Sequence, residues 1–597
     1  MKRIITALLC LALIFALGAC NTREPQQEQV TDPQSYEDVY KAIRACREKN
    51  DLNRDVWLES ADLVAGNSDE TAAPKSYNGT NVQVEGIDEG DIVKTDGEYI
   101  YAIMDSELRI YKADGENTAL ASYVNLEDDG FYPNEMYICG HKLMVISSRY
   151  EICCDYAYGE GESIAKSEPA TPMVKVFFYD ISNPVEISYV NCVGQDGWYI
   201  SSRLFDGKLY VVTNYCIWNE VVEDEPDTYI PHTYCNDVSK LVAADSICIK
   251  AELDAADYTV AVKYDAESGA ELGNLSLMGS MDTMYMSENS LYIASSNYFD
   301  DISEEYEKDG YTVTDTKTGT ETTVYRVDLA AMKAAANTTV PGLLKDQFSM
   351  DEFEGKLRLV TTNEVSSFST YYDKKHDFAN IEWHEDGESS STGLYILDSG
   401  LNTVAKVEGL AEGEYIRSVR FDGGYVYFCT FRQVDPLFAV NVSDPANPEI
   451  LSELKISGFS QYLHPWSDGL LFGLGMEADE DTGRTQGMKL VMFDISDKAD
   501  VKALHTLKLE SRYSEALYNH HALLISPEKG IIGFGVDSDY EIYGYDAEKG
   551  FSRLASVSLD SDWYVSRGMY IGHFAYIIDN SGVTVLDMQS FEIIAKI

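Results

Sequence analysis

One short phrase, a tight turn followed by a strand of alternating apolar residues, recurs along this chain of 597 residues. Copies such as TDGEYIY, FDGKLYV, FEGKLRL and FDGGYVYF belong to a set of nine. The turn residues of the set are Gly97, Gly140, Gly207, Asn289, Gly355, Gly423, Gly469, Gly530 and Gly572. Glycine and asparagine tolerate the positive φ that tight hairpins require. The phrase therefore predicts nine β-hairpins of one kind.

A second phrase follows each hairpin: an apolar run that usually closes on aspartate, as in VFFYD, VYRVD, LYILD and VTVLD. Beyond most of these runs lies one more apolar stretch, such as PEILSELKI. Each unit of about 45 to 65 residues thus supplies four strands in a fixed order, as a propeller blade does. We expect an all-β fold, a single large β-propeller of about eight or nine four-stranded blades over residues 81–597. A β-sandwich or a pair of barrels is the alternative, and neither explains the repeated phrase pair.

Longer stretches of the chain resemble a known family. The segments TNVQVEGIDEGDIVKTDGEYIYAI, LLKDQFSMDEFEGKLRLVTT and GLAEGEYIRSVRFDGGYVYFCTF are similar to the secreted bacterial and archaeal β-propeller domain family, distant relatives of WD-repeat propellers. The resemblance runs from about Tyr77 to about Val536. It implies export and a propeller fold, and it brings no agreed activity and no catalytic residues.

The N-terminus has the features of an export leader. Two basic residues precede an apolar run that is short for a membrane span, and small residues follow before a cysteine. The end of this run, Leu17-Gly18-Ala19-Cys20, resembles the bacterial lipobox, in which the cysteine is lipidated and becomes the new N-terminus. We therefore expect a signal peptide over residues 1–20 and an extracytoplasmic protein anchored to the bacterial cell membrane through Cys20 alone. Ordinary secretory cleavage is the alternative.

Between the lipobox and the first blade we expect little regular structure. Residues 21–34 are polar and contain proline, as a flexible tether would. Residues 35–80 are expected to hold a short helix, capped by Ser35 or Asp32, and then a linker. The helix is predicted from apolar residues near helical spacing, namely Tyr36, Val39, Tyr40, Ile43 and Cys46.

The chain is strongly acidic, with 100 acidic and 46 basic residues and a formal net charge of −54. Such a field repels phosphate backbones and anionic membrane surfaces, so we expect no nucleic-acid partner. Solubility is one interpretation of the charge, and attraction of divalent cations or cationic ligands is the other.

Seven cysteines fall between Cys139 and Cys248. Export permits disulfides among them, and the sequence does not determine the pairing. Buried thiols and a metal or redox role are the alternatives. The vicinal pair Cys153-Cys154 does not have a usual zinc-site spacing.

The units differ mainly between their second and third strands, where insertions occur at about 151–171, 216–257, 300–320, 363–391 and 476–487. In a propeller these connections emerge on one face, and insertions in repeat proteins tend to map to a binding face. The insertion after the third hairpin is the strongest candidate for a binding loop. Cys216 and Cys235 bracket four candidate binding residues in it: Trp218, Tyr229, His232 and Tyr234. Aromatic side chains can grip sugars or peptides, although the loop could instead fold its aromatics onto the propeller rim.

Metal and cofactor signals are weak. The acidic stretch EADEDTG could bind calcium through Asp479 and Asp481, but it lacks the spacing of an EF-hand loop. A solvated loop is the alternative. We expect no other cofactor.

Polar residues on the inner strands should line the central channel, and convergent charged groups there can form a ligand pocket. The candidates are Arg203, Asp351, Arg420, His464 and His521. Adjacent residues on one strand point to opposite faces, so at most one of His520 and His521 is expected to face the channel. Two histidines from neighbouring blades are too few ligands to predict a metal site. A solvated or salt-bridged lining is the alternative.

Enzyme signatures are absent from the sequence. It contains no HExxH, no GxSxG, no phosphate-binding glycine loop and no CxxCH. The sequence therefore favours a non-catalytic binding scaffold of the cell envelope, for a protein, peptide or glycan. The alternative is an extracytoplasmic hydrolase or lyase that acts on polysaccharide or peptide at the channel mouth, because scattered acid–base residues leave no local motif.

Overall fold

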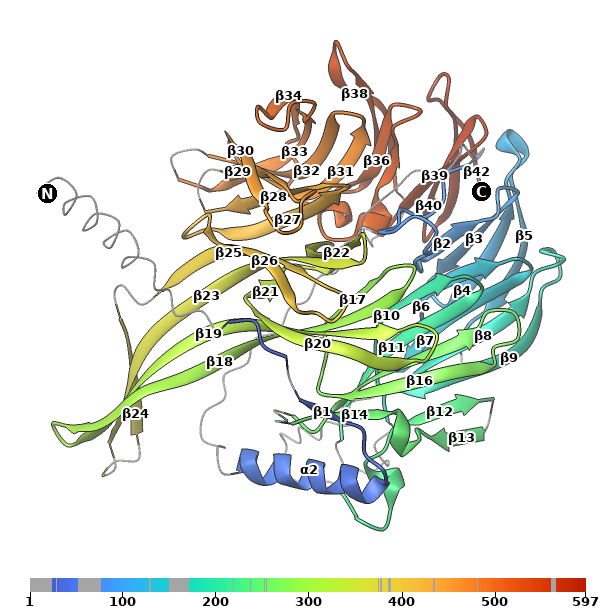
Figure 1. The fold of residues 1–597 in the computed structure, drawn as a ribbon. Coiled ribbons are helices and arrows are strands. Elements are labelled where there is room, and N and C mark those ends of the chain that lie inside the picture. Colours follow the sequence, from blue (N-terminus) through green and yellow to red (C-terminus); the bar gives the residue numbers. More distant parts are fainter. Residues whose placement is uncertain are drawn as a thin grey trace, which may run out of the picture.

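The computed structural model describes residues 24–51 and 77–597. Positions 28, 128–129, 150–170, 218–219, 237, 252, 254, 374, 376–377, 385–387, 433–434, 480–481 and 560–564 lie outside the description. The leader, Cys20 and the predicted calcium ligand Asp481 are therefore not described. Within the described residues, strands alternate with short turns almost throughout, and a single α-helix lies near the N-terminal end, after β1 (Val30–Thr31) (Figure 1).

The described chain forms nine antiparallel units of four strands, numbered here as blades 1 to 9 in chain order. Blade 1 holds β2 (Val93–Thr95), β3 (Tyr99–Met104), β4 (Glu107–Lys112) and β5 (Ala119–Asn125). Blade 2 holds β6 (Tyr132–Cys139), β7 (Lys142–Arg149), β8 (Met173–Asp180) and β9 (Ser188–Asp196), and adds β12 (His232–Cys235) and β13 (Val238–Leu241) at its edge. Blade 3 holds β10 (Trp198–Phe205), β11 (Lys208–Tyr215), β15 (Tyr258–Asp265) and β16 (Glu271–Met278), and adds β14 (Ile247–Lys250) and β1 (Val30–Thr31).

Blades 4 and 5 share one sheet. Blade 4 holds β17 (Thr283–Met286), β18 (Ser290–Lys308), β19 (Tyr311–Asp328) and β20 (Lys333–Pro341). Blade 5 holds β22 (Met350–Phe353), β23 (Lys356–Asp373), β25 (Ser389–Leu397) and β26 (Thr403–Leu410), with β21 (Leu343–Leu344) and β24 (Phe378–Trp383) paired to β23.

The last four blades are regular. Blade 6 holds β27 (Tyr415–Asp422), β28 (Tyr425–Phe431), β29 (Asp435–Asn441) and β30 (Glu449–Ile456). Blade 7 holds β31 (Phe459–Ser467), β32 (Leu470–Ala478), β33 (Thr485–Asp494) and β34 (Lys502–Lys508). Blade 8 holds β35 (Leu524–Ser526), β36 (Ile531–Val536), β37 (Asp539–Asp546) and β38 (Gly550–Ser558). Blade 9 holds β39 (Arg567–Ile571), β40 (Phe574–Asp579), β41 (Gly582–Asp587) and β42 (Ile593–Lys596).

The repeated turn joins the first two strands of every blade, as predicted. All eight turn glycines adopt positive φ, for example 92° at Gly97 and 72° at Gly355. Asn289 differs, because it is not among the residues with positive φ. In its turn the Ser287 hydroxyl accepts hydrogen bonds from the backbone N–H groups of Asn289 and Ser290, at 3.3 and 3.1 Å. A side-chain acceptor there replaces the left-handed residue.

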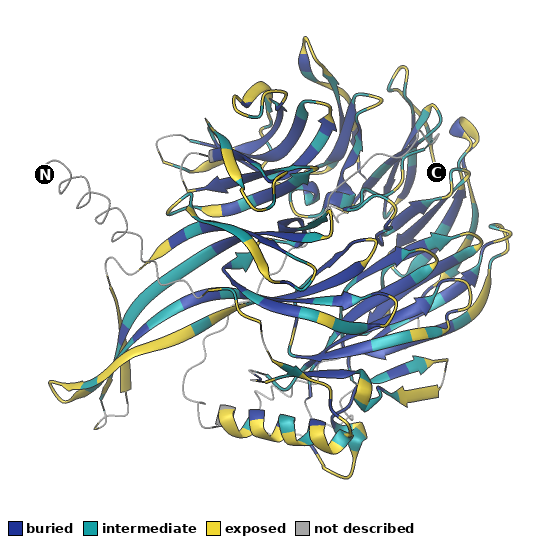
Figure 2. Cartoon of the chain, viewed as in Figure 1, coloured by how far each residue is buried: buried dark blue, intermediate teal, exposed yellow. Residues whose placement is uncertain are grey.

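Apolar faces of successive blades pack against each other and close the ring. One cluster joins the first blade to the last, with Ile100 and Met104 of blade 1 against Tyr576 and Val585 of blade 9. Figure 2 shows the result: strand interiors are buried and the connecting loops are exposed. Each blade hides an apolar face that it could not bury alone, which is why the units fold as a ring.

The segment 77–92, which precedes β2, lies across the inside of the ring. Isolated β-bridges tie Tyr77 to Ile571 of blade 9, Asp88 to Leu204 of blade 3, and Asp91 to Met136 of blade 2. Gln83 donates to the carbonyls of Gln347 and Met350, just before and at the start of blade 5. We call residues 77–92 the channel segment. Asp88 and Asp91 belong to this segment and not to a blade strand.

Two of the predicted insertions are strands that extend beyond the ring. β19 pairs with β23 over Thr312–Gly319 and Val365–Tyr372, and β18 and β24 flank the pair. We call the outer parts of β18, β19 and β23, together with β24, the arm. It projects to the lower left in Figure 1. The arm results from pairing between insertions of neighbouring blades.

Helix α2 (Tyr36–Asp51) confirms the predicted N-terminal helix. Ser35 caps it: the Ser35 hydroxyl accepts from the Asp38 N–H at 3.3 Å, and an Asp38 carboxylate oxygen accepts from the Ser35 N–H at 3.1 Å. This reciprocal pair is a capping box. Val39, Ile43 and Cys46 are buried. Among the described residues, no helix has both the length and the apolar character needed to cross a membrane.

Residues predicted as a tether lie against the ring. β1 pairs with β14, and Gln26 forms a β-bridge with Thr339 of blade 4. Glu24 is ion-paired with Lys406 of β26 at 2.8 Å. The chain therefore reaches the rim of blade 5 within a few residues of Cys20.

Candidate functional site

A cavity of about 830 Å³ opens at one mouth of the channel. The cavity is lined by the channel segment and by inner hairpin turns, including Gly140 and Gly207. It lies on the face that carries the repeated turns, opposite the insertions. Its acidic, basic and histidine lining residues come from the channel segment, β2, the turns of blades 1 and 3, blade 8 and blade 9: Glu85, Asp88, Asp91, Lys94, Asp96, Asp206, His521, Glu528 and Arg567.

The strongest ion pair of the cavity joins the channel segment to blade 9. Arg567 Nε lies 2.9 and 3.1 Å from the two carboxylate oxygens of Asp91, and Arg567 Nη1 lies 3.1 Å from Glu515 Oε2. Burial raises the pKa of Asp91, and the Arg567 guanidinium opposes that shift. The two carboxylates raise the pKa of Arg567 against the effect of burial. Breaking such a pair would leave an uncompensated buried charge.

Lys94 is held in a similar way on β2. Its Nζ lies 2.8 Å from Asp88 Oδ1 and donates to the backbone carbonyl of Glu89. The same ammonium group lies 5.4 Å from the centroid of the Tyr137 ring. The Lys94 side chain is buried whereas Asp88 is half-buried, so Asp88 is the carboxylate of this pair that meets the cavity.

Glu135 of β6 faces the channel segment. Its carboxylate accepts hydrogen bonds from the Tyr199 hydroxyl and, at 2.6 Å, from Ser202 Oγ. Burial raises the pKa of Glu135, and the hydrogen bonds from Ser202 and Tyr199 oppose that shift. A side chain at Gly90 would displace Glu135, because a Cβ there would lie 2.1 Å from Glu135 Cδ.

Glu89, His520 and His521 form a separate group next to the cavity. Glu89 Oε2 lies 3.8 Å from His520 Nε2 and 3.5 Å from His521 Nε2. All three donor atoms lie within 4.8 Å of one another. Burial lowers the pKa of both histidines well below the ordinary value, and the nearby cations Arg567, Lys94 and Arg203 add to the effect at His521. In the described residues, this is the group of His, Cys, Asp and Glu side chains placed closely enough to hold a metal ion.

His520 and His521 were expected on one strand, but they lie in a short 3-10 helix, η6 (His520–Ala522). His521 lines the channel-mouth cavity, and both histidines turn toward Glu89. Successive residues of a 3-10 helix are about 120° apart, so two neighbours can turn toward one acceptor. The Asn519 side chain caps the turn by accepting from the His521 N–H at 3.1 Å.

The five predicted channel residues fall into two places. Arg203 is buried, lies 3.5 Å from Glu89 Oε1 and donates to Gln347 Oε1 at 3.0 Å. His521 also faces Glu89, and His464 is linked through Tyr462 to Asn81 of the channel segment.

Asp351 and Arg420 belong to a second cluster, between blades 5 and 6. Asp351 accepts from Arg358 Nε at 2.9 Å, and Arg420 is buried near it. The Arg358 guanidinium lies between the rings of Phe353 and Phe421. Burial raises the pKa of Asp351, and Arg358 opposes that shift.

The aromatic insertion of blade 3 packs inward where it is described. Tyr229 is fully buried, and its ring lies 5.8 Å from that of Tyr40 on helix α2. Tyr229 is a core residue whose ring is not accessible to a ligand. Its prediction as a binding residue was therefore wrong. Trp218 lies outside the described residues.

His232 and Tyr234 share one buried acceptor. Asp196 Oδ2 lies 3.0 Å from His232 Nδ1, and Asp196 Oδ1 accepts from the Tyr234 hydroxyl at 2.7 Å. His232 Nε2 lies 3.3 Å from the exposed Asp227 carboxylate. These bonds hold the β12–β13 hairpin on blade 2. The hydrogen bond to Asp196 is the largest cause that raises the pKa of His232.

Cys139, Cys216, Cys235 and Cys248 carry free thiols. Burial raises the pKa of Cys216 and of Cys248 to about 12. Such thiols are inert at neutral pH. In the predicted calcium loop, Asp479 accepts from the N–H and the hydroxyl of Thr482, at 2.9 and 2.8 Å.

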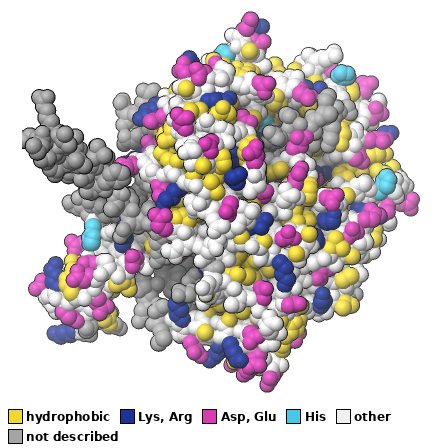
Figure 3. All heavy atoms as spheres, in the orientation of Figure 1, with side chains coloured by type: hydrophobic (Ala, Val, Ile, Leu, Met, Phe, Trp, Pro, Cys, Tyr) yellow, Lys and Arg dark blue, Asp and Glu magenta, His cyan; other side chains and the backbone are white. Residues whose placement is uncertain are grey.

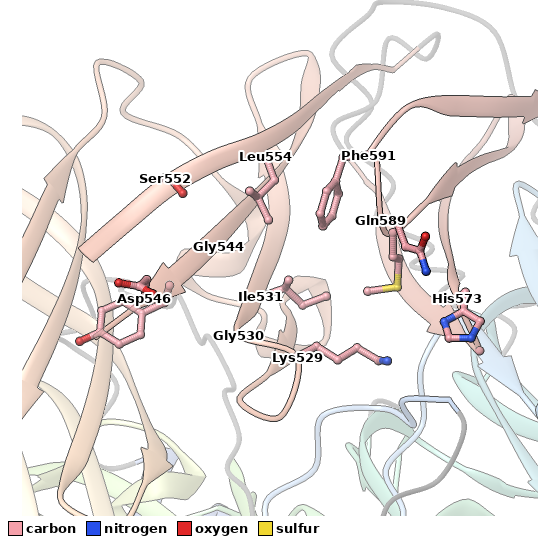
Figure 4. Close-up of a pocket in the computed structure, with 13 residues that line it drawn as sticks. Lys529, Gly530, Ile531, Gly544, Asp546, Ser552, Leu554, His573, Gln589 and Phe591 are labelled. Carbon is pink, nitrogen blue, oxygen red and sulfur yellow. The ribbon is translucent and has the colours of Figure 1, made fainter. Parts of the chain in front are cut away.

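A second cavity, of about 440 Å³, lies between blades 8 and 9 (Figure 4). Leu554, Ile531 and Phe591 line its apolar part, while Lys529 and His573 lie at its rim. It is smaller than the channel-mouth cavity and collects fewer charged side chains.

One face of the arm exposes a row of apolar side chains. Cross-strand pairing places Trp383 beside Phe368, Phe368 beside Thr316, and Thr316 beside Ile302. Paired residues share a face of a sheet, and alternate residues along a strand return to it. The exposed apolar members of this face are Tyr298, Ile302, Tyr372, Ile381 and Trp383. Figure 3 shows apolar and acidic side chains intermixed on the arm at the lower left.

Sequence reasoning missed Glu89, Lys94 and Glu135. Glu89 lies inside the acidic run EGIDEGD and Lys94 lies three residues after its end, shortly before the first repeated turn. Acidic residues next to a predicted inner strand could have indicated that this stretch contributes to the site. Nothing local marked Glu135, whose partners lie more than sixty residues away.

Comparisons with known proteins agree with this architecture. The family model for the Beta propeller domain matches residues 77–591. An uncharacterized protein of Archaeoglobus fulgidus is 28% identical over 595 residues, 88% of this chain and 85% of the relative. Uncharacterized protein MJ1554 of Methanocaldococcus jannaschii is 25% identical over 619 residues, 91% of this chain and 87% of the relative.

Solved structures are similar only at a low level. Hsv2p of Kluyveromyces lactis gives a TM-score of 0.27 at 9% identity, covering 65% of this chain and 96% of that chain. The periplasmic gluconolactonase of Pseudomonas aeruginosa gives 0.23 at 12% identity, covering 50% and 92%. Scores of this size carry no inference about function.

Proposed function

Because the chain belongs to the Beta propeller domain family, we propose that it is a non-catalytic binding propeller of the cell envelope, anchored through lipid on Cys20, whose arm contacts a partner protein. The observation that carries the proposal is the row of exposed apolar side chains on one face of the arm. A row of this kind is unusual on a surface that only meets water. Exposed tryptophan and tyrosine are typical of residues at the centre of protein interfaces.

The chemistry of the arm indicates the kind of partner. Acidic residues Asp300, Glu305 and Glu307 lie on β18, the strand that also carries Tyr298 and Ile302 of the apolar row, and the whole chain carries a net charge of −54. Complementary charge steers association and selects partners. We therefore expect the partner to present a basic surface.

The anchor and the arm belong to the same part of the ring. Glu24 is ion-paired with Lys406 on blade 5, and it lies four positions after Cys20 in the chain. Four residues span at most about 14 Å, so a lipid on Cys20 would hold blade 5 close to the membrane. Blade 5 contributes β23 and β24 to the arm, and an envelope protein would meet it there.

The test of the arm compares two faces of one sheet. Full-length chain without the leader, with Cys20→Ala for solubility, is compared with versions that add Trp383→Ser or Ile302→Ser. The matched control is Phe378→Ser, since Phe378 is 62% exposed and Ile302 65%, but Phe378 lies on the opposite face. We expect the first two variants to lose an envelope protein that the control retains, measured by quantitative capture and then with the purified partner. Equal capture by all versions would contradict the proposal.

The anchor has its own test. Cys20→Ala should move the protein from the membrane fraction to the soluble fraction without changing its melting temperature. Retention in the membrane fraction would show that something other than lipid on Cys20 holds it.

A second candidate function is an extracytoplasmic hydrolase or lyase that acts on polysaccharide or peptide at the channel mouth. It is favoured by the convergence of Asp88, Asp91, Lys94, His521 and Arg567 around the channel-mouth cavity. If it holds, wild-type protein cleaves cell-envelope polysaccharide or peptide and Asp88→Asn does not. No cleavage by the wild-type protein would leave the arm proposal as the account of this protein.

A further inference from the structure

We propose that Glu89, His520 and His521 form a binding site for a dication of the zinc type, inside the ring beside the channel-mouth cavity. The ligands come from two parts of the chain. Glu89 belongs to the channel segment, and the histidines belong to η6, which leads into blade 8. A bound ion would therefore tie the channel segment to the ring.

The distances fit coordination better than hydrogen bonding. Glu89 Oε2 lies 3.8 and 3.5 Å from the two imidazole Nε2 atoms. Both separations are longer than an ordinary N–H···O hydrogen bond. With metal–ligand bonds of about 2.0–2.1 Å, the edges of a tetrahedral site measure about 3.3–3.5 Å. Small movements of these side chains would bring all three atoms onto one ion.

The surroundings orient the Glu89 carboxylate. Its Oε1 accepts from the Gln83 N–H at 3.0 Å and faces Arg203 Nε at 3.5 Å. Oε2 is thereby turned toward the histidines. Supporting contacts of this kind fix the ligands of metal sites in proteins.

Both histidines present Nε2, the usual metal-binding atom of a neutral imidazole, to the Glu89 carboxylate. His520 Nε2 also lies 3.0 Å from the Asn81 carbonyl oxygen. Coordination through Nε2 would place the imidazole proton on Nδ1 and exchange that contact for a metal bond.

Three cations lie near the site. Arg203 faces Glu89 Oε1, whereas Arg567 is paired with Asp91 and Glu515, and Lys94 is paired with Asp88. Two nitrogens and one carboxylate are ligands that zinc, cobalt and nickel accept, whereas calcium and magnesium prefer oxygen throughout. His521 lines the channel-mouth cavity, so an ion could enter from there and keep one position open toward it.

Cobalt is the probe for the test, because its visible absorption reports the ligand set. Chain carrying Cys20→Ala is stripped with EDTA and titrated with Co²⁺, with Zn²⁺ as competitor, and its melting temperature is followed in parallel. We expect one ion per chain, a d–d spectrum without thiolate-to-cobalt charge transfer, and a rise in melting temperature. Glu89→Gln, His520→Asn and His521→Asn should each weaken binding at least about tenfold, the loss that even an outer-shell partner causes.

His573→Asn is the matched control, because His573 is an exposed histidine in blade 9. It should bind as wild type does. Circular dichroism of the stripped variants checks that each is folded, and any one folded ligand variant suffices for the comparison. Three outcomes would overturn the proposal: no binding of either ion by wild type, a thiolate charge-transfer band that assigns the ion to cysteines such as Cys139, or equal binding by wild type and the ligand variants.

Discussion

At the scale of single residues, polar side chains of the channel segment hold the inside of the ring together. Asp91 and Arg567 are 476 positions apart in the chain, yet they form a buried ion pair. Gln83 lies between Glu89 and Gln347 and bonds to both. Buried polar groups of this kind are stable only when their partners are present, so each contact depends on the whole ring.

Gly90 should not tolerate a side chain. Gly90→Ala would place a methyl group against Glu135, whose carboxylate is fixed by Tyr199 and Ser202. We expect a loss of about 1–3 kcal/mol in the free energy of unfolding, the usual cost of overpacking, measured by denaturant unfolding. Gly79→Ala is the control, because a Cβ there meets nothing within 4 Å. Equal stability of the two variants would contradict this account.

His232 should make stability depend on pH. The pKa of His232 is raised in the folded state by Asp196 and Asp227, so the folded protein holds the proton more tightly than the unfolded chain. This contribution is complete below the unfolded pKa of about 6.5 and disappears as pH rises through the higher folded value. His232→Gln should therefore lose more stability, relative to wild type, at about pH 5.5 than at about pH 8. A difference that does not change with pH would contradict the assignment.

At the scale of elements, the insertions fold in two different ways. Those of blades 4 and 5 paired with each other and formed the arm, whose edge strand β18 carries acidic residues that discourage further pairing. The insertion of blade 3 packed onto helix α2 and gave β12, β13 and β14. The first case leaves an apolar face exposed, and the second buries it.

Tyr229 should behave as a core residue that joins helix α2 to the blade 3 insertion. Tyr229→Ala removes a fully buried ring packed on Tyr40, and we expect a loss of about 3–5 kcal/mol in unfolding free energy. Val238→Ala, at a strongly exposed position in the same insertion, is the control and should change little. A small effect of Tyr229→Ala on the melting temperature would show that the helix is not held in this way.

At the scale of the whole molecule, nine blades close through sheet packing between the first and the last. The first blade is built from four consecutive strands near the N-terminal end and the last from four consecutive strands at the C-terminal end. In the described residues, no blade combines strands from both ends of the chain to close the ring. The channel segment bridges blades 2, 3 and 9 from inside. It supplies contacts across the ring that adjacent blades cannot make.

Removing the channel segment should therefore destabilise the ring. A chain that begins at residue 93 should melt at a lower temperature than one that begins at residue 77, because it lacks the bridges to Ile571, Leu204 and Met136 and the buried Ile87. Both chains lack helix α2, so the difference isolates residues 77–92. Equal melting temperatures by calorimetry would show that blade packing alone closes the ring.

The sequence alone determined the blades. A hairpin turn is set by a few adjacent residues, so Gly97 and its seven equivalents mark it locally, and alternating strands of fixed order follow. Part of the candidate site was also predicted: Arg203 and His521 do meet at Glu89.

Only the tertiary structure decided which distant groups share a site. Glu89 meets His520 and His521 because the channel segment crosses the ring, and β19 meets β23 because two insertions lie on adjacent blades. The burial of Tyr229 likewise depends on a helix that is nearly two hundred residues away in the chain. Such contacts follow from the closure of the ring, and no local pattern encodes them.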